Sequence, residues 1–140
     1  MTHREAERRA CERFVVPGAT VYCKEEGFFF KRKYTDDFYP VSDISLGGLR
    51  YLSQKPLKDN ARVSLKIVLP GEDATMEIKG RVKWVSPNPE KSYKYVIGIQ
   101  FEPYGTRKGN NAPRSLKRLE ILEQKFKSPA GRKSNDAPIR

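Results

Sequence analysis

Residues 62–69, RVSLKIVL, alternate between polar and apolar side chains and decide the fold class. A period of two places Val63, Leu65 and Ile67 on one face of a strand and the polar side chains on the other. Residues 76–85 and 93–101 repeat the pattern, and connectors rich in proline, glycine and asparagine separate the three runs. Three adjacent strands with short loops predict an antiparallel meander. The residues predicted to face inward on the two later strands are Met76, Ile78, Val82, Trp84, Tyr95, Ile97, Ile99 and Phe101.

Shorter strands are predicted upstream, over residues 20–23, 28–34, 41–46 and 49–53. Several short strands at this spacing indicate an all-β domain, either a small barrel or a sandwich. Downstream, Pro113 can open a helix, because proline is tolerated in a first helical turn. Apolar residues then recur every three or four positions, which predicts a stripe that covers the barrel or mediates association. The stripe consists of Leu116, Leu119, Leu122 and Phe126.

The two ends of the chain differ in composition from this core. Residues 1–13 are polar and are predicted to form a mobile arm or a frayed helix, whereas residues 14–104 form the folded core. The helix lies within residues 112–127. Residues 128–140 are rich in Ser, Pro, Gly and Lys and are predicted to be a disordered basic tail.

The net charge of +11 is concentrated near the end of the chain, where residues 105–140 hold ten Lys and Arg against three acidic residues. Such a segment either binds a polyanion or keeps the protein soluble. No apolar run approaches the roughly 18 residues of a membrane span, and the amino end lacks a secretory pattern. Because Cys11 and Cys23 are too few for a disulfide framework, the predicted location is the cytoplasm.

Residues with catalytic or metal-binding chemistry are scarce. The only histidine, His3, belongs to the polar arm, so activation of a nucleophile by histidine is not expected. Two cysteines and one histidine cannot assemble a structural zinc site. The sequence also lacks a phosphate-binding loop and a nucleophile elbow. It therefore predicts a binding protein rather than an enzyme, without a metal and without a cofactor.

Arginines cluster at the end of the arm, where Arg8, Arg9 and Arg13 lie close in sequence. The four-residue step from Arg9 to Arg13 places both guanidiniums on one side of the arm. Paired guanidiniums can bind a phosphate, donate to O6 and N7 of a guanine, or stack on a purine. In a chain with 28 Lys and Arg, the same spacing also fits a solvated charged helix.

A second motif, Asp-x-Ser-x-x-Gly, occupies the middle of residues 42–49. Asp43 and Ser45 share one face of a predicted strand, and Gly48, together with Gly47, is predicted to allow a turn through positive φ. Backbone N–H groups exposed at this turn could bind an anion. A carboxylate suits the donor-rich Watson–Crick edge of guanine, and a hydroxyl suits a phosphate oxygen. The alternative is an ordinary hairpin in which Asp43 bonds its own backbone.

The two motifs in this order resemble the PilZ domain family of bacterial cyclic di-GMP receptors. Residues 96–101, VIGIQF, are similar to the final core strand of the family, and the resemblance covers roughly residues 8–104. It implies a six-stranded antiparallel β-barrel, and a helix after the barrel is similar to what many members carry. Residues 24–40 depart from the pattern and look like an extended hairpin or an insertion. The ligand-binding residues that the resemblance implies are Arg8, Arg9, Arg13, Asp43, Ser45, Gly47 and Gly48.

The resemblance also implies a ligand and a mode of action. The ligand is cyclic di-GMP, with one or two molecules for each protomer, and the protomer is a monomer or part of a homodimer. Because the sequence contains no second domain, the effector is expected to be another protein, not identified by the sequence. Residues 4–13 are expected to become ordered when the dinucleotide binds and so to act as the switch.

An alternative function arises from residues 28–34, FFFKRKY. Aromatic side chains interleaved with Lys31, Arg32 and Lys33 on a small β-barrel are typical of proteins that bind single-stranded nucleic acid. Alternate aromatic residues of this run could equally fill the barrel interior. Nucleic-acid binding is therefore the alternative to a dinucleotide receptor.

Overall fold

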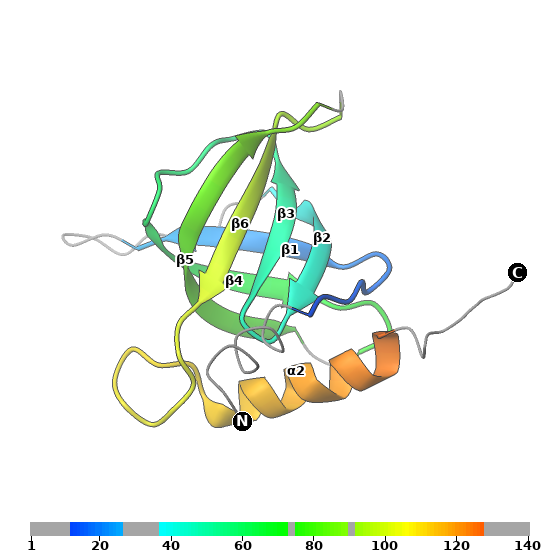
Figure 1. Cartoon of the computed structure of the whole chain (residues 1–140), viewed down its shortest axis with the longest axis vertical. Helices are drawn as coiled ribbons and strands as arrows, with labels where there is room; N and C mark the ends of the chain where they lie inside the picture. Colours follow the sequence, from blue (N-terminus) through cyan, green and yellow to red (C-terminus); the bar gives the residue numbers. More distant parts are fainter. Residues whose placement is uncertain (1–11, 27–36, 73–74, 90–91, 128–140) are drawn as a thin grey trace, which may run out of the picture.

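A computed structural model describes residues 12–26, 37–72, 75–89 and 92–127. The strands form a closed antiparallel barrel in the order β1-β2-β3-β6-β5-β4, and the helix follows the last strand (Figure 1). The predicted six-stranded antiparallel barrel with a C-terminal helix is confirmed. The strand predicted over residues 28–34 lies outside the described residues. The elements are β1 (Thr20–Glu25), β2 (Tyr39–Ser45), β3 (Gly48–Ser53), β4 (Arg62–Val68), β5 (Met76–Pro87), β6 (Tyr95–Phe101) and α2 (Pro113–Phe126).

The barrel interior is filled by the inward-facing residues of each strand. On β4, the side chains of Val63, Leu65 and Ile67 are at most 1% exposed, and the intervening polar residues face outward. Complete burial of one such side chain contributes roughly 1.5–3 kcal/mol to folding. Strands β4, β5 and β6 form the antiparallel meander that the alternation of polar and apolar side chains predicts.

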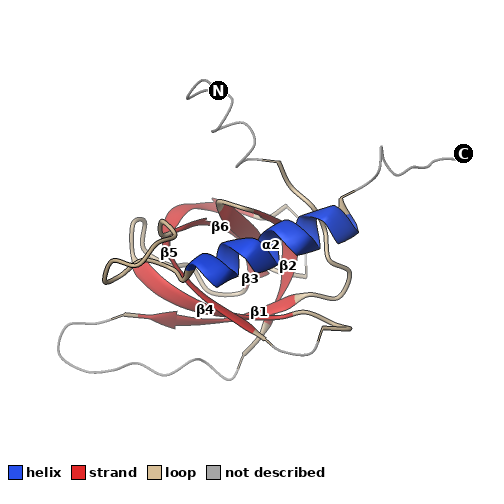
Figure 2. Ribbon diagram, turned by 90° about the horizontal axis from the view of Figure 1, so that it is seen from below, coloured by secondary structure: helices blue, strands red, loops and turns tan. Residues whose placement is uncertain are grey.

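Helix α2 crosses one open end of the barrel (Figure 2). Pro113 occupies its first turn, and Leu119 and Leu122 are fully buried against the strands. Leu116 and Phe126 continue the same stripe and are half-buried. Of the two uses predicted for this stripe, covering the barrel is the one that the structure shows.

Among the described residues, no helix combines the length and the apolar composition needed to cross a membrane.

The prediction that Trp84 faces the interior is wrong. Strand β5 contains a bulge between Val82 and Trp84, and beyond it Val85 packs against the core instead. The extra residue of a bulge reverses the alternation of side chains along a strand. Trp84 therefore lies on the outer face opposite Gly98, where a side chain on Gly98 would overlap the indole ring.

Strands β3 and β6 approach each other closely at Gly48. A Cβ at this position would collide with the carbonyl oxygen of Ile99 on β6. Neither Gly47 nor Gly48 has a positive φ, so the prediction that these glycines allow the turn through positive φ is wrong. Gly48 is needed because it has no side chain. The glycines of the described chain that do have positive φ are Gly18, Gly71 and Gly109.

Asparagine substitutions separate these two reasons for a glycine, because asparagine tolerates positive φ better than most residues but still carries a Cβ. We expect Gly48→Asn to lower the free energy of unfolding by about 3 kcal/mol through overpacking. Gly71, with φ +84° and open space where a Cβ would stand, is the control, and Gly71→Asn should change that free energy by less than about 0.5 kcal/mol. Urea unfolding of both variants measures the difference in free energy of unfolding. A similarly small loss of stability in both variants would contradict the close approach of Gly48 to Ile99.

Candidate functional site

The β2–β3 hairpin carries most of the predicted site. Ser45 pairs with Gly48 across the two-residue turn Leu46–Gly47, and Asp43 pairs with Arg50 further along the same hairpin. Asp43 and Arg50 lie on the outer face, because the adjacent residues Ile44 and Leu49 point into the core. The hairpin thus brings four of the predicted site residues together.

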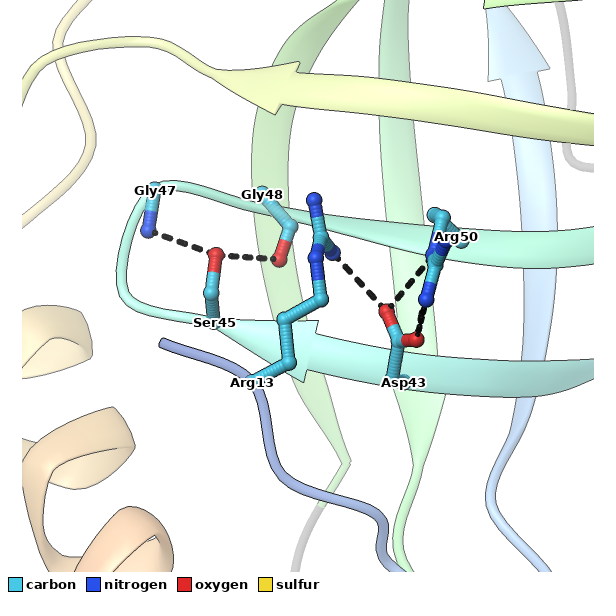
Figure 3. Close-up of polar contacts among 6 residues, drawn as sticks. All are labelled: Arg13, Asp43, Ser45, Gly47, Gly48 and Arg50. Carbon is cyan, nitrogen blue, oxygen red and sulfur yellow. Dashed lines mark hydrogen bonds and ion pairs between the residues drawn. The ribbon is translucent and has the colours of Figure 1, made fainter. Parts of the chain in front are cut away.

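The segment before β1 brings Arg13 to this hairpin. Phe14 is buried, and its backbone exchanges two hydrogen bonds with Ile44 of β2, of 2.8 and 2.9 Å. The adjacent Arg13 then points outward, and its Nη1 donates to Oδ1 of Asp43 over 2.8 Å (Figure 3). Arg8 and Arg9 lie outside the described residues.

Arg50 is a site residue that was not predicted from the sequence. Its Nε donates to both carboxylate oxygens of Asp43, over 3.1 and 3.0 Å, and its Nη2 also contacts Oδ2 (Figure 3). The hydrogen bond to Asp43 raises the pKa of Arg50, and the negative charge of Asp43 adds to the effect against the opposing desolvation. A signal for Arg50 does exist in the sequence, since counting outward from a two-residue turn at Leu46–Gly47 places it opposite Asp43.

The charges of this cluster favour an anionic ligand. The side chain of Asp43 is only 11% exposed, whereas those of Arg13 and Arg50 are 38% and 40% exposed. One carboxylate and two guanidiniums leave a net charge of +1, and the exposed parts of both guanidiniums face solvent. Guanidinium groups bind phosphates and carboxylates through paired hydrogen bonds. The partners of Asp43 in the described structure are thus arginine side chains rather than its own backbone.

Ser45 organises the turn. Its side chain is buried, and its Oγ accepts a hydrogen bond from the N–H of Gly47 over 3.2 Å and donates to the carbonyl of Gly48 over 3.3 Å. The hydroxyl therefore ties together the two glycines of the motif (Figure 3). In this structure Ser45 shapes the surface next to Asp43 without being exposed itself.

Trp84 lies in the same row of the outer face as the charged cluster. Across the sheet, Asp43 pairs with Arg50, Arg50 with Gly98, and Gly98 with Trp84. The missing side chain of Gly98 leaves room for the indole, which is half-buried. An aromatic surface thus stands two strands away from Arg50.

A groove of about 970 Å³ opens on the other side of the turn, between Leu46–Gly47 and α2. Two ion pairs lie along it, Arg81 with Glu102 over 3.3 Å and Lys127 with Glu12. Carboxylates outnumber cations here, so the groove repels phosphates and the arginine cluster is the better anion site. The charged residues lining it are Glu12, Arg81, Glu102, Glu120, Glu123 and Lys127.

Two further features of the sequence bear on the choice of site. The described part of the chain contains no cluster of three or more metal-ligating side chains. The aromatic and basic run 28–34, on which the nucleic-acid alternative depends, lies outside the described residues.

Several solved structures share this fold. YcgR of Escherichia coli, solved in complex with c-di-GMP, matches with a TM-score of 0.57 and 16% identity, over 81% of this chain and 43% of that chain. MrkH of K. pneumonia in its apo state matches with a TM-score of 0.54 and 20% identity, over 76% and 46%. The inhibitor of motility MotI/DgrA of Bacillus subtilis matches with a TM-score of 0.53 and 18% identity, over 81% and 49%. This chain covers less than half of each of these proteins.

Sequence comparison identifies the family. A search of curated proteins finds no match. The family model described as "PilZ domain", however, matches residues 7–116, which includes the segment before the barrel, all six strands and the start of α2. With a match over most of its length and the barrel that its structure shows, this chain belongs to the PilZ domain family.

Proposed function

We propose that this chain is a receptor for cyclic di-GMP. The observation that carries the proposal is the Asp43 carboxylate, held on the outer face of the barrel between the guanidiniums of Arg13 and Arg50. A guanine base offers two neighbouring N–H donors to such a carboxylate, and the phosphates of the ligand accept from guanidiniums. Membership of the PilZ domain family and the fold shared with YcgR, which was solved with c-di-GMP, support this choice.

Ligand binding is proposed to exchange partners at Asp43. The carboxylate can accept from guanine only when a guanidinium gives up part of its hydrogen bonding. Arg50 holds both oxygens from the neighbouring strand, whereas Arg13 reaches one oxygen from the segment before the barrel. Arg13 is therefore the partner that leaves, and its guanidinium then binds a phosphate or stacks on a base.

The remaining site residues have supporting roles in this proposal. Arg8 and Arg9 provide further guanidiniums from the arm for the phosphates and bases. Ser45 holds Gly47 and Gly48 in a compact turn, so that the ligand can approach the backbone. Trp84 offers a surface on which a purine can stack. These residues bind and orient a ligand, and none is assigned a catalytic role.

The signal is proposed to pass to a partner protein through the arm. Residues 4–13 contain four Arg and three Glu but little apolar surface, so several arginine contacts with the ligand are needed to order them. The ordered arm then presents a new surface to an effector protein in the cytoplasm. The receptor acts as a monomer or a homodimer.

The ligand site is tested by calorimetric titration with cyclic di-GMP. We expect Arg13→Ala and Asp43→Ala each to lower the affinity about ten- to a hundredfold, because each removes charge-assisted hydrogen bonds of roughly 1.5–3 kcal/mol. The matched control is Arg107→Ala, an exposed arginine in the loop after β6, which should leave the affinity unchanged.

Thermal unfolding without ligand separates binding from stability. Both guanidiniums are more than one third exposed, so loss of the Asp43 ion pairs should lower the unfolding free energy by less than about 1 kcal/mol. Unchanged affinity in both variants would show that cyclic di-GMP binds elsewhere. No binding to the unsubstituted protein would refute the proposed function.

The role of the arm is tested by limited proteolysis. With saturating cyclic di-GMP, we expect trypsin to cut after Arg8, Arg9 and Arg13 several-fold more slowly than in its absence, because the ligand engages these side chains. Cleavage after Arg107 and Lys108, both exposed, should proceed at the same rate in both conditions and serves as the internal control. Equal cleavage of the arm in a sample with proven binding would mean that another segment carries the signal.

A further inference from the structure

The turn between β2 and β3 lacks the backbone conformation that two-residue hairpin loops favour. Such loops prefer types I′ and II′, which need a positive φ at one or both central residues. Neither Leu46 nor Gly47 has a positive φ. Other turn types tend to splay the two strands, so contacts from outside the hairpin must help to hold this turn in place.

Two hydrogen bonds supply these contacts, one from the last residue of β6 and one from the segment that follows it. The hydroxyl of Tyr104 donates to the carbonyl of Leu46 over 2.6 Å, and the N–H of Phe101 donates to the carbonyl of Gly47 over 2.8 Å. The hydroxyl of Tyr104 is protonated at neutral pH like that of any tyrosine, and burial raises its pKa further, so it is a hydrogen-bond donor to the turn. Both central carbonyls of the turn are thereby engaged.

Tyr104 is itself held firmly. Its backbone forms a bridge with Asn111, whose side chain is buried. The Asn111 amide donates to the carbonyls of Lys79 and Glu102, over 2.9 and 3.0 Å, and its oxygen accepts from the N–H of Lys79 over 2.8 Å. These bonds anchor the segment that carries Tyr104 to strand β5, and the phenol reaches the turn from that fixed point.

The bond from Tyr104 sets the direction of a whole peptide group. The carbonyl of Leu46 and the N–H of Gly47 belong to one trans peptide, so they point in opposite directions. When the carbonyl points to Tyr104, the N–H points to Oγ of Ser45, where it donates over 3.2 Å. The bond from Tyr104 therefore also fixes the orientation of the Ser45 hydroxyl and its bond to Gly48, although Tyr104 lies 58 residues from Leu46 in the sequence.

We propose that Tyr104 is a positioning residue for the ligand-binding turn, acting through the Leu46–Gly47 peptide on Ser45 and Gly47. It fixes the turn before the ligand arrives, which lowers the ordering cost of binding. This inference rests on the proposed function, because the affinity that it controls is the affinity for cyclic di-GMP. Tyr104 does not lie in either sequence motif, and its role follows from the hydrogen bond alone.

The variant Tyr104→Phe removes only the hydroxyl. Calorimetric titration with cyclic di-GMP should show an affinity roughly three- to tenfold lower, the range expected for one neutral hydrogen bond. The matched control is Tyr51→Phe, which removes another buried hydroxyl, one that bonds to Cys23 inside the barrel. Tyr51→Phe should lower the melting temperature but change the affinity less than twofold, whereas a merely structural role of Tyr104 would make the two variants behave alike.

The amide resonance of Gly47 in a ¹⁵N-labelled sample without ligand provides a readout that does not depend on binding. We expect this resonance to shift or broaden in Tyr104→Phe and to stay in place in Tyr51→Phe. An unchanged Gly47 resonance, or an unchanged affinity despite a shifted resonance, would overturn the proposal. If the unsubstituted protein does not bind cyclic di-GMP, the proposed function fails and so does the claim about affinity, while a shifted resonance would still establish that Tyr104 orients the turn.

Discussion

The register of the β2–β3 hairpin is the constraint on which the site depends. With Ser45 opposite Gly48, Asp43 meets Arg50 on the outer face, and the adjacent Ile44 and Leu49 fill the core. A slip of one residue would turn both charged side chains into the barrel, where the cost of unpaired or poorly solvated charge is several kcal/mol. The close approach of Gly48 to Ile99 holds β3 against β6 as well. The hairpin therefore cannot slide without a collision or a buried charge.

The sequence predicts the structure of some regions of the chain better than that of others. The alternation of polar and apolar side chains predicts β4 and most of β5 and β6, because each of these strands has one face buried in the core. It fails at Trp84, since a bulge changes the phase without leaving a mark in the pattern of polar and apolar residues. The motif locates Asp43, Ser45, Gly47 and Gly48, but the reason for Gly48 is a strand contact that local sequence does not reveal. Arg50 could be found by counting from the turn, whereas the bond from Tyr104 joins residues 58 apart and needs the folded barrel.

The candidate site combines residues fixed on barrel strands with one residue, Arg13, from the segment before the barrel. Asp43 and Arg50 stand on neighbouring strands of a closed barrel, and the turn beside them is held by hydrogen bonds from Phe101 and Tyr104. Arg13 comes from a segment attached to the barrel through Phe14. A ligand that takes the place of Arg13 at Asp43 therefore changes the contacts of that segment while the barrel stays as it is. Under the proposed function, this division of roles gives the receptor a physical basis for reporting binding through its amino-terminal arm.

The central claim is that the Asp43 carboxylate recognises the Watson–Crick edge of guanine. Guanine presents N–H donors at N1 and N2, whereas adenine presents an acceptor at N1 and has no amino group at C2. Calorimetric titration of the same protein with cyclic di-GMP and with cyclic di-AMP measures this difference directly, because the two ligands share their phosphates and sugars. We predict binding of cyclic di-GMP and an affinity for cyclic di-AMP that is at least about a hundredfold lower, since adenine has no N–H donors at N1 and C2 to replace the hydrogen bond that Arg13 gives up at Asp43. Equal affinity for the two dinucleotides would contradict the account.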